Sequence, residues 1–267
     1  MIAQVIREAT PEAVLEEYRL GASLATGFDV HISSLDPVYC NRETYRRIFT
    51  SAPHPTLCLN YDGDRLFRPR NLPEEQRIRE MITAVECGAN AIDLVGYSFD
   101  TAGQGEMMQY DPAFPFTRAH PREVTLASAA IRQQCRVVDY VHSIGGEVLI
   151  STHTGVYLHT DEVVSLAKWI EERDPDIIKI VLNGCNTDER VAEVLASIVE
   201  LKKVLHCRFS LHANGEKGVK TRMLGPLFGS YMMFTVREAK EGYDPNQLPL
   251  SSAAAFMAQS AASGLMT

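Results

Sequence analysis

The chain has 267 residues, of which 45% are hydrophobic and 22% are charged, as in a folded protein with a sizeable core. The formal net charge is −8 and no basic cluster is longer than a pair, so the composition excludes nucleic acid as a partner. No apolar run approaches a membrane span, we expect no signal peptide, and the 6 cysteines lack metal-binding spacing. We therefore expect a cytoplasmic protein with reduced thiols and no membrane partner.

Strands and helices are predicted to alternate from the start of the chain. Thr10 and Pro11 cap and begin the first helix, Asn41 caps the second, and Gly88 stops the third. The predicted elements of this half are strand 2–6, helix 11–26, strand 28–33, helix 42–49, strand 55–60, helix 73–87 and strand 91–95.

Residues 96–120 are irregular and rich in glycine, proline and aromatic residues. At roughly 25 residues, this stretch is longer than most connections in compact domains. Its aromatic content favours a packed lid over a disordered linker.

The alternation continues in the second half of the chain. The predicted elements are helix 121–143, strand 147–152, helix 160–172, strand 177–182, helix 187–203, strand 207–211, helix 221–227, strand 230–236 and helix 251–262. About eight strand–helix repeats predict an α/β fold, a (β/α)8 TIM barrel. We expect one domain over residues 1–267, with a loop insertion at about 96–120. The alternative is an open doubly wound sheet, for which a G-x-G-x-x-G motif is missing.

Lys179 stands in the middle of the aliphatic strand predicted at residues 177–182. Burial disfavours the charged form of a lysine, and imine chemistry with a ketone requires the neutral amine. The alternative is a lysine whose amine reaches solvent at the strand end.

Active sites of such barrels form at the C-terminal ends of the strands, where polar residues are therefore candidates. They are Ser33, Ser34, Asn60, Tyr61, Ser151, His153, Lys179, Asn183, His212 and Asn214. If the faces that carry His153 and Lys179 point inward, the histidine lies beside the lysine and moves protons for imine chemistry. The alternative for His153 is a bond to a loop carbonyl, and we interpret His206 and His212 as structural.

Four motifs follow one another in a characteristic order: VLISTH at 148–153, DIIKI at 176–180, GVKTR at 218–222 and DPNQL at 244–248. They resemble motifs of the type I 3-dehydroquinate dehydratases, and the resemblance covers nearly the whole chain. It implies a (β/α)8 barrel that forms a homodimer. By resemblance, the catalytic residues are Lys179, which forms the Schiff base, and His153, and the substrate carboxylate is bound by Arg222 and Gln247.

The N-terminal half departs from the family pattern. Residues 32–34 (ISS) replace Glu-x-Arg, although Asp36 matches, and residues 59–61 (LNY) replace Thr-Phe-Arg. Arg65 stands in place of a glutamate and Tyr243 in place of a serine. The candidates for substrate binding at these altered positions are Ser34, Asn60, Tyr61 and Tyr243.

The resemblance implies a small keto-acid substrate and no metal or organic cofactor. Lys179 would form an iminium, and His153 would remove the adjacent proton and return it to the departing hydroxyl. Three functions remain open: a 3-dehydroquinate dehydratase that forms 3-dehydroshikimate, a Schiff-base lyase or aldolase for another keto acid, and a non-catalytic carboxylate-binding protein.

Overall fold

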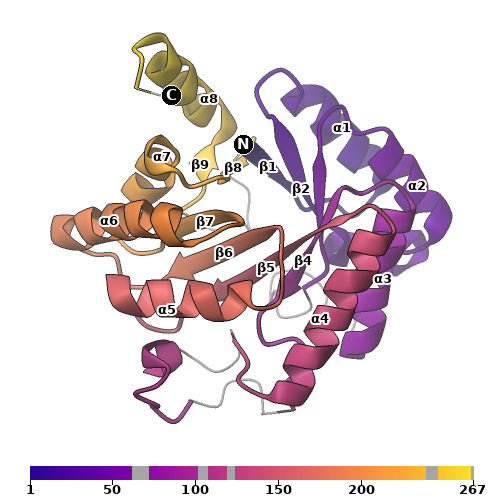
Figure 1. Ribbon diagram of the computed structural model, residues 1–267. Coiled ribbons are helices and arrows are strands. Elements are labelled where there is room, and N and C mark those ends of the chain that lie inside the picture. Colours follow the sequence, from indigo (N-terminus) through magenta and orange to yellow (C-terminus); the bar gives the residue numbers. More distant parts are fainter. Residues whose placement is uncertain (62–71, 102–107, 119–123, 239–245, 266–267) are drawn as a thin grey trace. The chain divides into compact units, whose positions relative to one another are not determined.

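A computed structural model describes residues 1–61, 72–101, 108–118, 124–238 and 246–265 (Figure 1). The strands are β1 (Ile2–Ile6), β2 (Gly27–His31), β3 (Thr56–Leu59), β4 (Ala91–Val95), β5 (Glu147–His153), β6 (Ile177–Leu182), β7 (Arg208–Ala213), β8 (Met233–Val236) and β9 (Leu248–Pro249). The α-helices are α1 (Pro11–Gly21), α2 (Arg42–Thr50), α3 (Glu74–Glu86), α4 (Ser128–Ser143), α5 (Thr160–Glu171), α6 (Asp188–Val204), α7 (Gly218–Phe228) and α8 (Leu250–Ala262). Three short 3₁₀ helices are η1 (Ile32–Ser34), η2 (Pro37–Tyr39) and η3 (Pro115–Arg118).

The chain divides into two compact units. Unit 1 comprises Met1–Asp93, Val141–Glu147 and Phe234–Thr267, and unit 2 comprises Leu94–Tyr140 and Val148–Met233. The prediction of a single domain remains a prediction.

Strands β1 to β4 of unit 1 and strands β5 to β7 of unit 2 are parallel to their neighbours and follow one another in chain order. In unit 1, β1 pairs with β2, β2 with β3, and β3 with β4, while in unit 2 β6 lies between β5 and β7. A doubly wound sheet reverses its strand order at a switch point, and neither the run from β1 to β4 nor the run from β5 to β7 contains such a reversal. Parallel strands that alternate with helices form a (β/α)8 barrel, as predicted.

Side-chain caps begin three helices at the residues where polar caps are expected. Thr10, Asn41 and Thr187 accept hydrogen bonds from the amides of Ala13, Thr44 and Arg190. The predicted starts of α1, α2 and α6 are confirmed.

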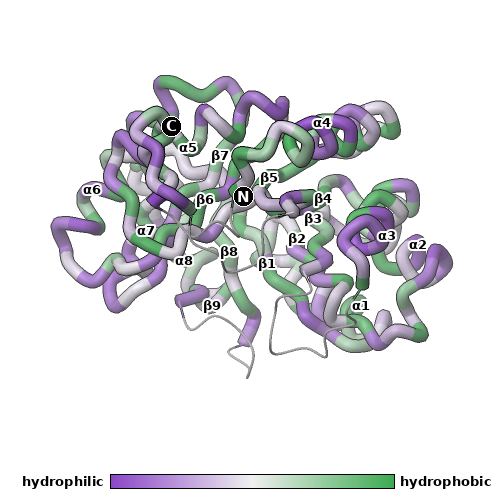
Figure 2. The backbone as a smooth tube through the Cα atoms, turned by 90° about the horizontal axis from the view of Figure 1, so that it is seen from below, coloured by the Kyte–Doolittle hydropathy of each residue, from purple (hydrophilic) through white to green (hydrophobic). Residues whose placement is uncertain are grey.

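The helices bury one face each. In α3, Ile78, Met81, Ala84 and Val85 are buried and recur at helical spacing, and hydrophilic and hydrophobic colours alternate along this helix in Figure 2. All residues of β1, β2, β3, β4 and β6 are buried.

No helix among the described residues is both long and apolar enough to cross a membrane. The six cysteines, all among the described residues, form no disulfide in this structure.

Helix α4 starts later than predicted. Residues 119–123 lie outside the described residues, and 124–127 are not helical, so the helix begins at Ser128. The reason is tertiary: the amide of Thr125 donates to the carbonyl of Gly96 at 3.1 Å, and its hydroxyl accepts from the amide of Ala127. These bonds hold the backbone in a turn that periodicity alone does not reveal.

Two boundaries and one additional strand near the C-terminus also differ from the prediction. Strand β8 begins at Met233 instead of residue 230, because the amide of Met232 donates to the side-chain hydroxyl of Ser210 on β7 at 2.9 Å instead of joining the backbone ladder. Helix α7 begins at Gly218 instead of residue 221, and the two-residue strand β9 was not predicted.

The described part of the 96–120 stretch packs on helix α5. The rings of Phe114 and Trp169 lie 4.9 Å apart, and Phe116 is fully buried beside them. Arg118 forms two hydrogen bonds of 2.6 Å with Glu162 of α5. Phe114 and Phe116 are therefore packed, as predicted, whereas Tyr110 is exposed, and a role as a lid remains a prediction.

Candidate active site

Strands β5, β6 and β7 of unit 2 carry the candidate site. Lys179 of β6 is in register with Ser151 of β5, and His153 is in register with Val181, two residues further along β6. Residues paired across parallel strands point to the same face of the sheet, and side chains alternate along each strand. His153 and Lys179 therefore share a face of adjacent strands, as predicted.

Lys179 is buried, with only 7% of its surface exposed. Every other residue of β6 is buried as well. An amine that extends into open solvent does not fit this burial. A lysine held in this way is suited to nucleophilic chemistry on a ligand that enters the site.

His153 ends β5 as an exposed residue, and its imidazole has protein atoms around it. This surrounding protein, and then the charges of Lys179 and Arg222, lower the pKa of the imidazole well below its ordinary value. The ring is therefore neutral near pH 7 and is able to accept a proton.

The backbone around His153 is fixed on both sides. The amide of Thr154 donates to the carbonyl of Val181 at 2.9 Å, and the side chain of Asn183 donates to the carbonyl of Thr154 at 2.8 Å. The amide of Gly96 donates to the carbonyl of Ser151 at 2.7 Å. These bonds set the direction in which the histidine leaves the strand.

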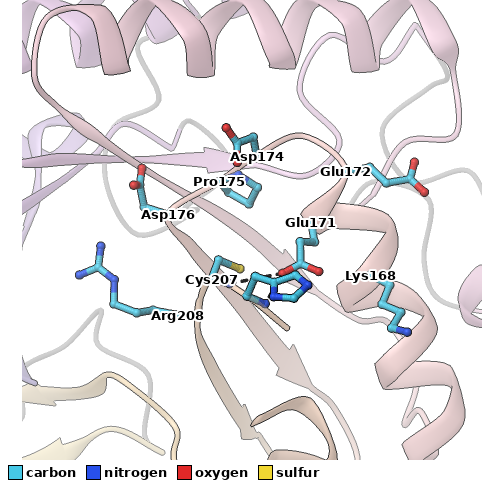
Figure 3. Close-up of a pocket in the computed structure, with 9 residues that line it drawn as sticks. Lys168, Glu171, Glu172, Asp174, Pro175, Asp176, Cys207 and Arg208 are labelled. Carbon is cyan, nitrogen blue, oxygen red and sulfur yellow. Dashed lines mark hydrogen bonds between the residues drawn. The ribbon is translucent and has the colours of Figure 1, made fainter. Parts of the chain in front are cut away.

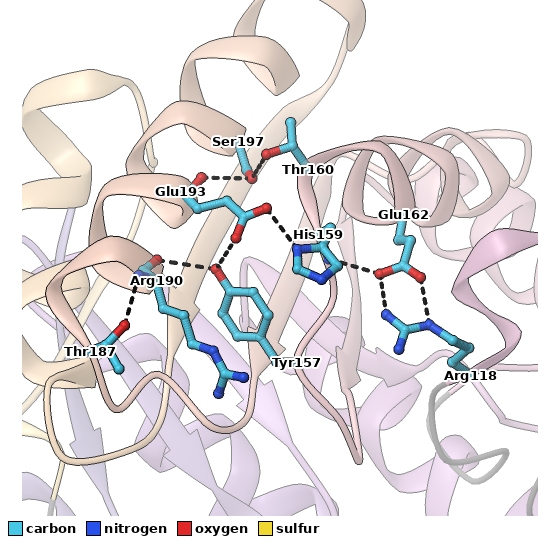
Figure 4. A network of polar contacts seen from close by, with 9 residues as sticks. All are labelled: Arg118, Tyr157, His159, Thr160, Glu162, Thr187, Arg190, Glu193 and Ser197. Atoms are coloured by element: carbon cyan, nitrogen blue, oxygen red, sulfur yellow. Dashed lines mark hydrogen bonds and ion pairs between the residues drawn. The ribbon is translucent and has the colours of Figure 1, made fainter.

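The loop after His153 is fastened to helices α5 and α6 by the polar network in Figure 4. Tyr157 donates to the carbonyl of Arg190 at 3.1 Å, and its hydroxyl lies 3.2 Å from the carboxylate of Glu193. Nδ1 of His159 lies 2.9 Å from the same carboxylate, and the amide of His159 donates to Glu162 at 2.8 Å. The end of β5 is thus supported by two helices.

Arg222 of α7 places a second cation at the site. The residue is 6% exposed, and its Nη2 donates to Oδ1 of Asn214 at 2.6 Å. Its charge lowers the pKa of both His153 and His212. The guanidinium, Lys179 and His153 therefore belong to one cluster of side chains in unit 2.

His212 joins this cluster, although a structural role was predicted for it from the sequence. It is in register with Val181, as His153 is, but from the opposite side of β6. The signal was available in the sequence, because Ser210, His212 and Asn214 share one face of β7. Only the register between strands shows that this face is the one that carries Lys179.

Two predicted substrate-binding residues have clear positions within unit 1. Ser34 ends η1, and its buried hydroxyl has no hydrogen-bond partner among the described residues. Asn60 follows β3, and its side chain donates to the carbonyl of Arg77 and to Glu80, both at 3.0 Å. The amide nitrogen of Asn60 is thus engaged with helix α3, and its role in substrate binding remains a prediction.

The remaining candidates lie near segments that the structure does not describe. Tyr61 is half-buried in unit 1, and Tyr243 lies outside the described residues. Gln247, also in unit 1, has a buried side-chain oxygen without a hydrogen-bond partner in the described part of the chain. The roles of these three residues remain predictions.

A surface pocket of unit 2 lies at the other end of the same strands (Figure 3). Its lining comprises Lys168, Glu171, Glu172, Asp174, Pro175, Asp176, His206, Cys207 and Arg208. These residues precede or begin β6 and β7, so the pocket is separate from the candidate site. The described residues contain no cluster of three or more histidine, cysteine or acidic side chains suited to a metal ion.

The fold and this cluster define a class of protein: a (β/α)8 barrel with a buried lysine and a proton-accepting histidine on one face of adjacent strands. The chain belongs to the type I 3-dehydroquinase family, whose model matches residues 114–262. It is 29% identical to the 3-dehydroquinate dehydratase of Clostridium kluyveri over 131 residues, 48% of this chain and 50% of that protein. The chain thus spans about half the length of the curated relatives it matches.

Solved structures extend the likeness over nearly the whole chain. The 3-dehydroquinate dehydratase of Geobacillus kaustophilus HTA426 has a TM-score of 0.74 at 16% identity and covers 98% of this chain and 91% of its own. The type I enzyme of Clostridium difficile has a TM-score of 0.72 at 15% identity, with coverages of 97% and 92%. At these identities the likeness shows the fold, and the (β/α)8 prediction is confirmed.

Proposed function

We propose that the protein is a Schiff-base-forming hydro-lyase that eliminates water from 3-dehydroquinate to give 3-dehydroshikimate. The observation that carries the proposal is the shared face of Lys179 and His153 on adjacent strands, with Arg222 close enough to act on the same histidine. Membership of the type I 3-dehydroquinase family supports this choice of reaction.

The first step joins Lys179 to the substrate. The unprotonated amine bonds to the ketone carbon, the ketone oxygen leaves as water after proton uptake, and an iminium remains. The iminium withdraws electrons and acidifies the neighbouring C–H bond.

His153 then moves one proton twice. The imidazole takes the proton from the carbon beside the iminium, and the electron pair of that bond forms an enamine. The enamine expels the hydroxyl from the next carbon as the imidazolium returns its proton, so that water departs. Hydrolysis of the conjugated iminium releases the product and restores the amine.

Arg222 supplies the anion-binding part of the site. A guanidinium binds a carboxylate through two parallel charge-assisted hydrogen bonds, and Asn214 holds this one in place. An anion here also offsets the positive charge that lowers the pKa of His153, so substrate binding makes the imidazole a stronger base.

A second candidate is a Schiff-base lyase or aldolase for a different keto acid. Asn60 favours this candidate. It is one of the residues expected to contact substrate hydroxyls, but its side chain is hydrogen-bonded to helix α3 instead. A site with other hydroxyl contacts discriminates among keto acids differently.

Turnover separates these functions. The protein is incubated with 3-dehydroquinate and, separately, with a panel of other keto acids, and formation of the conjugated enone is followed by absorbance. Enone formation from 3-dehydroquinate that is lost in Lys179→Ala supports the first function. Turnover of another keto acid alone supports the second, and binding without turnover leaves a carboxylate-binding protein.

The cytoplasmic homodimer implied by the resemblance is likewise a proposal. Light scattering after gel filtration tests the oligomeric state.

A further inference from the structure

A second histidine flanks Lys179 from the side opposite His153. Val181 of β6 is in register with His153 on β5 and with His212 on β7. Lys179 lies two residues before Val181, on the same face of β6. Adjacent strands are about 4.8 Å apart, so the backbones of the two histidines are separated by about 10 Å. A ligand joined to the amine of Lys179 therefore has one histidine strand on each side.

His212 is as recessed as the lysine. Its exposed fraction is 4%, compared with 7% for Lys179 and 6% for Arg222. The amine, the guanidinium and His212 are therefore buried to a similar extent.

Strand β7 holds this histidine firmly. The amides on both sides of it are bonded to side chains: Leu211 to the Ser230 hydroxyl at 3.1 Å, and Ala213 to the Thr221 hydroxyl at 2.9 Å. The same strand face continues to Asn214, the partner of Arg222. His212 thus occupies a fixed position beside the anion-binding group.

Burial, followed by the neighbouring charges, decides the protonation state of His212. Burial, then Arg222 of α7, Lys179 of β6 and His153 of β5, lower the pKa of His212 well below its ordinary value. A neutral imidazole presents one N–H donor and one nitrogen acceptor. This pair matches an alcohol, which also donates once and accepts, whereas a carboxylate only accepts.

We infer that His212 is a specificity-determining residue that binds a substrate hydroxyl lying between the ketone held at Lys179 and the carboxylate held at Arg222. The inference rests on the proposed function for the identity of the two ends of the ligand. It predicts that His212 makes the site prefer hydroxylated ligands over ligands without hydroxyls.

The competing explanation is that His212 only fills space. Two ligands without a ketone separate these explanations: quinate, which carries hydroxyls, and cyclohexanecarboxylate, which carries none. Their dissociation constants are measured by calorimetry for the wild type, His212→Leu and His212→Gln. We expect His212→Leu to weaken quinate binding by about 3- to 10-fold, the value of one hydrogen bond, and to leave cyclohexanecarboxylate within about 2-fold.

The glutamine variant retains a donor and an acceptor, so it should recover part of the quinate affinity and guards against misfolding of the leucine variant. His206→Gln is the matched control, because His206 is exposed and lies before β7. Equal weakening of both ligands, an unchanged preference for quinate, or no quinate binding by the wild type overturns the inference.

Borohydride trapping keeps this test distinct from the test of the lyase. The wild type is treated with 3-dehydroquinate or 3-oxocyclohexanecarboxylate in the presence of borohydride. If neither forms an adduct but quinate preference depends on His212, the lyase proposal fails and the hydroxyl-binding role stands. If adducts form, and His212→Leu forms less adduct than the wild type by the same factor with both ketones, the hydroxyl-binding role fails and the lyase proposal stands.

Discussion

Lys179 and His153 lie on one face of adjacent parallel strands and are offset by two residues along the strand. Residues in successive layers are about 6.6 Å apart along a strand, a distance that an extended lysine side chain spans. The charge of Lys179 lowers the pKa of His153, so the two groups lie within electrostatic reach. One strand thus supplies the nucleophile and its neighbour the proton acceptor.

Replacing Arg222 should weaken substrate binding. Arg222→Lys keeps the charge but loses the planar fork that holds a carboxylate, and we expect the KM for 3-dehydroquinate to rise by about 10- to 100-fold. Steady-state kinetics measure this change. Lys220→Gln, on the exposed side of α7, is the control and should leave KM unaltered. An unchanged KM in Arg222→Lys would show that the substrate carboxylate is not bound by Arg222.

The pH profile should reflect the lowered pKa of His153. A histidine with its ordinary pKa loses its base form below about pH 6.5, whereas this one remains neutral at lower pH. The profile of kcat/KM should therefore stay level between pH 7.5 and about 5.5. His153→Gln should lower kcat by about 10²- to 10⁴-fold across this range. An acid limb near pH 6.5 in the wild type contradicts this account of the histidine.

Burial of neutral His212 should make folding sensitive to acid. Below about pH 6.5 the unfolded chain binds a proton at this residue and the folded chain does not, so stability falls as pH falls. Between pH 7.5 and 5.5, His212→Gln should lose about 1.4 kcal/mol less unfolding free energy than the wild type. Urea unfolding at the two pH values measures the difference, and equal losses in both proteins would be the contrary result.

Phe116 should anchor the described part of the 96–120 stretch. Its ring is fully buried against Trp169, so Phe116→Ala should reduce the free energy of unfolding by about 3–5 kcal/mol. Tyr110→Ala is the control from the same stretch: Tyr110 is 56% exposed, and its loss should change stability by at most about 0.5 kcal/mol. Similar effects of both changes would show that the stretch is not anchored through Phe116.

Local chemistry made much of the fold predictable. Thr10, Asn41 and Thr187 cap helices through bonds to residues three positions ahead, so their signals lie within a short window. The start of α4 was not predictable in this way, because Thr125 bonds to Gly96, far away in the sequence. The boundary of β8 depends in the same way on Ser210.

The candidate site likewise contains residues that local sequence patterns predict and residues that only the strand register reveals. Lys179 and His153 were found because each sits on a strong strand pattern, and the register of β5 and β6 places them together. His212 was set aside as structural because its importance depends on the register of β7 against β6, which no local pattern encodes. The bonds of Asn60 to helix α3 were hidden for the same reason.

The most direct test of the central claim is covalent trapping at Lys179. The wild type and Lys179→Arg are incubated with 3-dehydroquinate and borohydride, digested, and analysed by mass spectrometry. The proposed mechanism predicts a reduced adduct on the peptide that contains Lys179 and none in the variant. Turnover of 3-dehydroquinate without an adduct, or an adduct on a different lysine, would contradict it.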